Sequence, residues 1–322
     1  ERLRMAIDAS IFKMHCGEGL ISEEGEYSDS IFDSLVLDSN GLRCRHTETS
    51  FEYGVEVTVQ DADGNRFSSY WWDATPMLKD LNIKDCGEIA FKRAMSQIGP
   101  VKIESGKYSM VIESEVASRL VTPVLNALGG YSLQQKNSFM LDSLGKKMFP
   151  EWLNIWDRPV SVGETGSRLF DSEGVATAEM PIVENGVVKE YFVNTYMSRK
   201  MGVEATVEDA TRPVVLPCFA PSVAEPVEAT CGKEELMRIV GEGILVTGFN
   251  GGNSNSATGD FSFGVEGFLF KDGKIVHPVR EMLITGNLLT LWNNLLAAGN
   301  DARFCKSKLI PTLAFGNVDF SA

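Results

Sequence analysis

Three histidines, His15, His46 and His277, are the only imidazole side chains in the 322-residue chain, and they limit every mechanism that needs one. His46 shares a predicted strand face with Cys44, because alternate residues of a strand point the same way. Cys44 and His46 could be two metal ligands, but no second pair of ligands lies nearby in the sequence. A partly buried structural role is therefore favoured over a metal site. His15 and Cys16 are adjacent on a predicted helix and point about 100° apart, which is poor geometry for a nucleophile and its base.

Four carboxylates in turns rich in serine and glycine could gather around a hard cation. Solvated turn carboxylates are far commoner, so composition favours the plainer interpretation. The sequence also lacks G-x-S-x-G, G-x-x-x-x-G-K-[ST] and a strand-linked G-x-G-x-x-G, so ordinary serine hydrolases and nucleotide-binding proteins lose their main support. The four carboxylates are Asp142, Asp171, Glu173 and Asp260.

The stretch "GGNSNSATGD", residues 251–260, combines three glycines with short polar side chains. Glycine leaves backbone N–H groups approachable, so such a stretch can hold an anion or an extended peptide. A plain loop whose side chains cap their own backbone has the same composition. The residues concerned are Gly251, Gly252, Asn253, Ser254, Asn255, Thr258 and Gly259.

Composition narrows the class of protein. Hydrophobic residues make up 43% and charged residues 23%, as in globular proteins, and the length suits about two domains. No apolar run approaches the roughly 20 residues that span a bilayer. The formal net charge of -14 opposes direct contact with DNA or RNA. The six cysteines form no C-x-x-C pair and no signal peptide opens the chain, so we expect a cytoplasmic protein.

Asn-Gly and Asp-Gly pairs join strand-like runs at four places, and these dipeptides tolerate the positive φ of tight hairpins. Antiparallel sheet is therefore expected to dominate an α+β fold with few helices. The helical pattern of Leu3, Ile7 and Ile11 predicts further structure before Glu1. The four turns are Asn40-Gly41, Asp63-Gly64, Asn185-Gly186 and Asp272-Gly273.

Helices are predicted over residues 86–97, over residues 114–128 and from Lys233. A fourth follows Asn287, where leucines and a tryptophan repeat at helical spacing as far as residue 296. Asn287 is a natural N-cap for this helix and Gly299 a natural stop.

Three segments, in this order, resemble the TldD/PmbA family, long labelled modulators of DNA gyrase. They are "KNSFMLDSLGKKMFPEWLNI" from Lys136, the stretch from Phe170 to Gly202, and residues 251–301, which begin "GGNSNSATGDFSFGVEGFLF". The resemblance covers most of residues 100–310. It implies an α+β fold with a truncated N-terminal domain and a larger β-rich C-terminal domain. The stretch "QIGPVKIESGK", residues 97–107, separates a predicted helix from the next strand, so we expect the two domains to cover residues 1–100 and 101–322.

The resemblance also implies two branches. The TldD branch is a zinc metallopeptidase with H-E-x-x-x-H on a helix and a downstream cysteine ligand, and the PmbA or TldE branch has a similar fold and pairs with TldD. Here "SEVASR" stands in place of that motif, so Ser114 and Arg119 occupy the histidine positions and Glu115 the glutamate position. Cys305 matches the downstream cysteine.

A catalytic zinc site needs about three protein ligands, and a fixed positive charge such as that of Arg119 opposes a divalent cation. Glu115 would be a general base without a metal-bound water to activate. We therefore expect a PmbA/TldE-type subunit without its own zinc site. Its partner would be a TldD-like zinc metallopeptidase acting on unfolded or peptide-like substrates, and a homodimer is an alternative assembly.

Two other functions remain open. The chain could be a metallopeptidase in its own right, with His277, Cys305 and Glu115 as atypical ligands. It could instead be a non-proteolytic binding partner that acts on DNA gyrase.

A protease complex must hold many sequences, and main-chain hydrogen bonds are the part of a peptide that does not vary. We therefore expect the glycine-rich stretch to lie beside the substrate path and to hold an extended peptide by its backbone. Arg119, if it faces the same cavity, would hold a carboxylate. The predicted substrate-binding residues are Gly251, Gly252, Asn253, Ser254, Asn255 and Gly259.

Overall fold

The structure is a computed structural model, and it describes residues 4–5, 19–223 and 231–322. Its elements form an α+β fold with antiparallel sheets and a larger β-rich C-terminal region, as the sequence predicts. None of the described helices combines the length and apolarity needed to cross a membrane. The helix of Leu3, Ile7 and Ile11 and the pair His15 and Cys16 lie outside the described residues.

Contacts between residues divide the chain into two units. The first contains Glu1–Leu35, Cys44–Pro100 and Ser161–Thr165. The second contains Val36–Arg43, Val101–Val160 and Gly166–Ala322.

A three-stranded sheet forms the first unit, in the order β1 (Leu20–Leu37), β2 (Arg43–Gln60), β3 (Arg66–Thr75). The short helix η1 (Leu78–Asp80) and helix α3 (Cys86–Ser96) follow. Alternate residues of β2 are buried on one face and belong to the same core as the apolar side of α3, as expected for a strand covered on one face. This core includes Tyr53, Val55, Val57, Val59, Ala90, Phe91 and Ala94.

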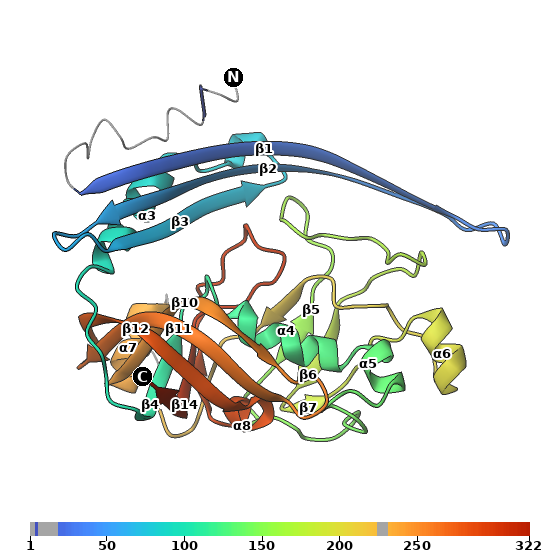
Figure 1. The fold of residues 1–322 in the computed structure, drawn as a ribbon. Coiled ribbons are helices and arrows are strands. Elements are labelled where there is room, and N and C mark those ends of the chain that lie inside the picture. Colours follow the sequence, from blue (N-terminus) through green and yellow to red (C-terminus); the bar gives the residue numbers. More distant parts are fainter. Residues whose placement is uncertain (1–3, 6–18, 224–230) are drawn as a thin grey trace. The chain divides into compact units, whose positions relative to one another are not determined.

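Five strands close into a ring in the second unit, because β14 pairs with both β4 and β12. Neighbouring strands are antiparallel except β10 and β4, which are parallel. In Figure 1, β10, β11 and β12 lie side by side. The ring consists of β4 (Gly106–Ile112), β10 (Gly243–Ser254), β11 (Asp260–Lys271), β12 (Lys274–Asn287) and β14 (Leu313–Ser321). Two short strands continue the sheet beyond β14, namely β13 (Leu295–Ala298) and β9 (Cys218–Phe219).

A second sheet in this unit has the order β7-β6-β5-β8. Its strands are β5 (Ile155–Asp157), β6 (Met180–Glu184), β7 (Val187–Val188) and β8 (Pro213–Val215). The described helices of the unit are α4 (Ser118–Ala127), α5 (Gly130–Gln134), α6 (Thr195–Met201), α7 (Lys233–Val240) and α8 (Leu288–Asn293).

Helix α4 is held against the ring by its apolar face. Leu120, Val121 and Val124 are buried in the same core as Phe263 of β11 and Trp292 of α8. The Trp292 indole N–H donates to the Leu120 carbonyl at 3.3 Å. Burial of this face fixes where the residues before α4 lie, and those residues carry the candidate site.

The four predicted turns are confirmed. Each Asn-Gly or Asp-Gly pair joins two strands, and at Asn185-Gly186 and Asp272-Gly273 both residues have positive φ, between 50° and 74°. These values suit a type I′ turn, whose backbone twist matches that of the two strands of a hairpin.

Two helix predictions need correction. The helix after Asn287 ends at Asn293, because Leu295–Ala298 pairs as strand β13 with β14 and β9, so Gly299 is not its stop. The Asn287 cap is confirmed, since its Oδ1 accepts from the Leu289 N–H at 3.1 Å. The helix predicted from Ser114 starts four residues later, at Ser118.

Candidate functional site

The candidate site begins where β4 ends. The Glu113 N–H donates to the Val246 carbonyl of β10 at 3.1 Å, and the N–H groups of Val116 and Ala117 both donate to the Glu113 carbonyl. Ser114 and Glu115 therefore lie in turns that lead into α4. Their place is set by β4 on one side and by the buried face of α4 on the other.

Two cations hold the side chain of Glu115. Lys306 Nζ lies 3.0 Å from Oε2 and donates to the Glu115 carbonyl at 2.6 Å, and Arg303 forms an ion pair with Oε1. All three side chains are at most 18% exposed, so water screens these pairs weakly. Both carboxylate oxygens of Glu115 are thus engaged by positive charge.

Cys305, which lies between Arg303 and Lys306 in the sequence, is buried. Ser114 is also buried, and its N–H donates to Thr312 Oγ1 at 3.3 Å. A second ion pair joins the buried carboxylate of Glu113 to the partly exposed Lys233 at 2.7 Å. The surroundings are therefore a network of fixed charges and hydrogen bonds.

These residues do not fit a zinc ion. Of the four positions predicted to correspond to the zinc-binding motif and its downstream cysteine, only Glu115 and Cys305 have side chains that ligate Zn²⁺ in proteins, and Glu115 already contacts two cations. His277 lies on β12, paired with Leu269, and its Nδ1 is 3.1 Å from the Pro278 carbonyl oxygen. Among the residues that the structure describes, no three His, Cys, Asp or Glu side chains are grouped so that they could share a metal ion.

Arg119 points toward the glycine-rich stretch. Its guanidinium donates to the Gly252 carbonyl at 2.9 Å and lies 5.2 Å from the ring centroid of Phe263. The contact joins the predicted second histidine position to the predicted peptide-binding stretch. The sequence placed these two features on separate elements, and only the fold brings them together.

The stretch itself is half strand and half turn. Gly251–Ser254 is the end of β10 and pairs with β11, whereas residues 255–259 form the hairpin turn. In the described structure β10 pairs with β4 only from Ile244 to Val246, so beyond Val246 its one strand neighbour is β11. The opposite edge of β10 has no strand beside it there, and Arg119 reaches the Gly252 carbonyl on that edge.

Turn residues cap their own backbone. Asn255 Oδ1 accepts from the N–H groups of Ala257 and Thr258, at 2.9 and 3.3 Å. Asp260 accepts from the Asn287 amide at 3.0 Å and from the Thr258 hydroxyl at 2.7 Å, and these bonds lower the pKa of Asp260. The Asn253 side chain is exposed.

Two of the glycines are needed by the fold. A Cβ at Gly252, where φ is +91°, would lie 2.0 Å from the Ser262 carbonyl oxygen, and one at Gly259 would lie 3.1 Å from the Phe139 ring. Gly251 has φ of +138° but no atom within 4 Å of its Cβ position. The close approach of β11 therefore explains why residue 252 is a glycine, and no ligand is needed to explain it.

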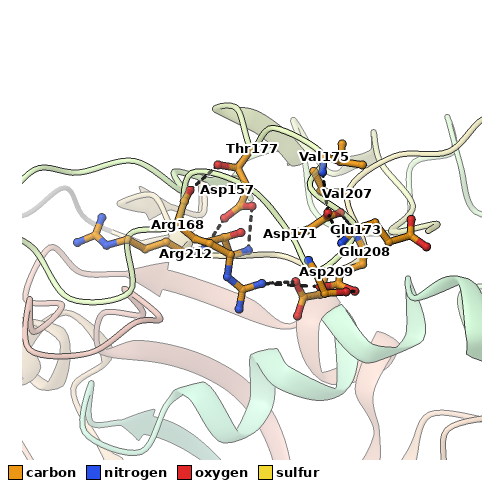
Figure 2. A network of polar contacts seen from close by, with 12 residues as sticks. Asp157, Arg168, Asp171, Glu173, Val175, Thr177, Val207, Glu208, Asp209 and Arg212 are labelled. Carbon is orange, nitrogen blue, oxygen red and sulfur yellow. Dashed lines mark hydrogen bonds and ion pairs between the residues drawn. The ribbon is translucent and has the colours of Figure 1, made fainter. Parts of the chain in front are cut away.

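Of the four candidate carboxylates, two lie together. Asp171 accepts backbone hydrogen bonds from Glu173, Val175 and Glu208, as Figure 2 shows. Glu173 in turn accepts from the Thr195 N–H at 2.8 Å. These bonds fasten a turn to the start of α6. Asp142, with φ of +55°, lies in a turn after α5, and Asp260 lies in the β10–β11 hairpin.

Asp157, on β5, is a buried carboxylate that sequence reasoning missed. It is 1% exposed and accepts from the backbone N–H groups of Thr211 and Arg212, at 2.9 and 2.6 Å (Figure 2). Burial raises the pKa of its carboxyl group. No local pattern around Asp157 signals this, because both partners are more than 50 residues away along the chain.

The pair Cys44 and His46 lies on β2 in the first unit, where His46 Nε2 is 3.6 Å from Glu48. This contact is an ion pair only when the histidine is protonated.

Comparisons with known proteins agree along the chain. Residues 105–322 match the family described as "PmbA/TldA metallopeptidase C-terminal domain", and residues 4–98 match "PmbA/TldA metallopeptidase central domain". The chain is 28% identical, over 97% of its length, to the Escherichia coli O157:H7 protein named "Metalloprotease PmbA", of which it spans 69%. It is 35% identical, over 67% of its length, to the Haemophilus influenzae "Metalloprotease PmbA homolog", of which it spans 46%.

A solved structure is similar over the whole chain. This Bacteroides thetaiotaomicron protein, named as a candidate modulator of DNA gyrase, has a TM-score of 0.93 and 40% identity. The match covers 100% of this chain and 71% of that one. Both family matches and this structural match point the same way, and the chain belongs to the PmbA/TldD metallopeptidase family.

Proposed function

We propose that this chain is a PmbA/TldE-like subunit of a TldD-type zinc metallopeptidase complex that cleaves unfolded or peptide-like substrates. In this proposal the chain has no zinc site of its own, and the zinc belongs to a TldD-like partner subunit. The complex works in the cytoplasm, and the chain contributes to substrate binding.

The observation that carries the proposal is the state of Glu115. A general base of a zinc peptidase needs a free carboxylate beside a metal-bound water. Both oxygens of Glu115 are instead paired with Arg303 and Lys306. Two fixed positive charges beside this residue repel a divalent cation, and Arg119 adds a third at the second histidine position.

Substrate binding is assigned to the free edge of β10 and the hairpin that follows. An unpaired edge offers N–H and carbonyl groups to any extended chain, which suits a protease that accepts many sequences. The residues proposed for this role are Gly251, Gly252, Asn253, Ser254, Asn255 and Gly259. Of these, Asn253 is exposed, and replacing its side chain is the least disruptive test of the hairpin.

Reconstitution tests the proposal. The chain, a TldD-like subunit and their mixture are each incubated with an unfolded protein such as reduced casein, with and without a chelator. We expect cleavage only by the mixture, inhibited by the chelator, and a co-eluting heterodimer on sizing. Asn253→Ala should lower the cleavage rate without changing assembly.

Other outcomes select the other functions. Chelator-sensitive cleavage by the chain alone would mean a metallopeptidase with atypical ligands such as His277, Cys305 and Glu115. Stable capture of DNA gyrase, with no effect on cleavage by a TldD-like subunit, would mean a non-proteolytic binding partner. Either result would overturn the proposal.

A further inference from the structure

The free edge of β10 is interrupted at one point. The Gly252 carbonyl faces this edge and accepts a hydrogen bond from Arg119 at 2.9 Å. An added strand that ran past Gly252 would need this same carbonyl for its own N–H group. The stretch from Thr247 to Gly251 is therefore the longest run of this edge that a peptide can pair with while the Arg119 bond stays intact.

Arg119 has hydrogen-bonding capacity to spare. A guanidinium carries five N–H donors in a planar fork. In the described structure one hydrogen bond to Gly252 and one ring contact to Phe263 are its interactions, and no carboxylate pairs with it. Its side chain is exposed.

The guanidinium of Arg119 lies over one ring of an aromatic cluster. Phe263, over which it lies, is buried, stacks on Phe261 at 5.3 Å and meets Phe249 edge-on at 5.6 Å. An arginine that lies on a ring and donates to a backbone carbonyl loses little entropy when it binds an anion, because it is already ordered.

Resting on the proposed substrate contact, we infer that Arg119 binds the C-terminal carboxylate of an extended peptide that pairs with the edge of β10 from Thr247 to Gly251. The peptide runs parallel to β10 in this arrangement, so its C-terminus lies at the Gly252 end of the edge, and the terminal carboxylate has the charge that Arg119 binds. An acidic side chain within a longer strand fits less well, since that strand would continue past Gly252 and compete with Arg119 for the carbonyl. The ligand class is thus a free peptide C-terminus, as in protein fragments and unprotected tails.

The test compares peptides that differ only at the C-terminus. A short fluorescent peptide without acidic residues is made as the free acid and as the amide, and a third peptide carries one internal glutamate and a C-terminal amide. Binding is measured by fluorescence anisotropy to the chain, alone and together with a TldD-like subunit whose zinc has been removed.

We expect the free acid to bind about tenfold tighter than both amides, the usual effect of hydrogen bonds to a charged group. Arg119→Met should remove this difference, and Arg119→Lys should retain part of it, because lysine keeps the charge but not the fork. Arg199→Met, which removes an exposed arginine on α6, is the matched control and should leave the preference unchanged.

Equal binding of acid and amide to the unaltered chain would overturn the inference and leave the subunit role intact. So would a preference that survives Arg119→Met, or an internal-glutamate amide that binds as tightly as the free acid. If neither the acid nor the amides bind, the peptide contact on which the inference rests is itself wrong.

Discussion

Lys306 Nζ lies 3.0 Å from Glu115 Oε2 and 2.6 Å from the Glu115 carbonyl oxygen, so one ammonium group binds both the side chain and the backbone of this residue. With Arg303 it ties the segment around Cys305 to the turns before α4. Ion pairs thus connect these two segments of the chain.

Removing the negative charge of this cluster should destabilise the protein. Glu115→Gln removes the carboxylate charge that Arg303 and Lys306 both contact, among side chains that are at most 18% exposed. We expect a loss of about 2 to 3 kcal/mol in the free energy of unfolding, below the range for fully buried pairs. Urea unfolding followed by tryptophan fluorescence measures it.

The matched control is the same substitution in an exposed ion pair. Glu151 lies 3.1 Å from Lys147, and their side chains are 75% and 54% exposed. Glu151→Gln should cost less than about 0.5 kcal/mol. Equal losses in the two variants would mean that the Glu115 cluster is held no more tightly than a surface pair.

Gly252 and Gly251 should respond differently to alanine. Both have positive φ, which costs a residue with a Cβ about 1 kcal/mol. At Gly252 the added carbon would also meet the Ser262 carbonyl oxygen at 2.0 Å, whereas at Gly251 it would meet open space. Gly252→Ala should therefore lose about 2 kcal/mol more than Gly251→Ala in chemical denaturation. Losses of equal size would show that β11 moves aside freely.

Asp157 should make stability fall as pH rises through mild acid. Burial raises the pKa of its carboxyl group in the folded protein, so the unfolded chain loses this proton at a lower pH. Between the two pKa values the folded state holds more protons, and raising the pH lowers the free energy of unfolding.

Asp157→Asn removes this contribution. The variant gives up one acceptor for the Thr211 and Arg212 N–H groups and is less stable in acid, but the deficit should shrink as the pH rises above 3.8, the ordinary pKa of this carboxyl group. Urea titrations at several pH values test this. A constant or growing deficit would contradict the raised pKa.

Asn287 should hold down the pKa of Asp260. Its amide donates to Asp260 at 3.0 Å and is the main cause of the lowered pKa, ahead of the Thr258 hydroxyl. Asn287→Ala should raise the pKa of Asp260 toward its ordinary value, as followed by NMR titration of the carboxyl carbon. Asn253→Ala, on the same hairpin, should not. An unchanged titration in Asn287→Ala would mean that Thr258 dominates.

Local chemistry predicted the local structure well. The dipeptide turns and the Asn287 cap depend on a few neighbouring residues, and all are present. The predicted length of the last helix was wrong. Leu295 and Leu296 continue the helical spacing, but these residues belong to β13, which pairs as a strand with β14 and β9, and those partners are distant in sequence. A residue pattern cannot show which distant strand is available.

The candidate site was predictable only in part. Resemblance to the family pointed to Ser114, Glu115, Arg119 and Cys305. The glycine-rich composition of residues 251–260 pointed to Gly252. The partners that define their chemistry could not be read from the sequence: Glu115 meets Arg303 and Lys306 across more than 180 residues, and Arg119 meets Gly252 across 133. Both contacts follow from the strand order, in which β4 lies between β10 and β14.

The most direct test of the central claim is the zinc content of the purified chain. Elemental analysis after exposure to excess zinc and desalting should find well under one equivalent in the unaltered protein, and the same value in Cys305→Ser. A TldD-like subunit treated in parallel should retain about one equivalent, as expected for a catalytic site with three protein ligands. Stoichiometric zinc in this chain that is lost in Cys305→Ser would contradict the account.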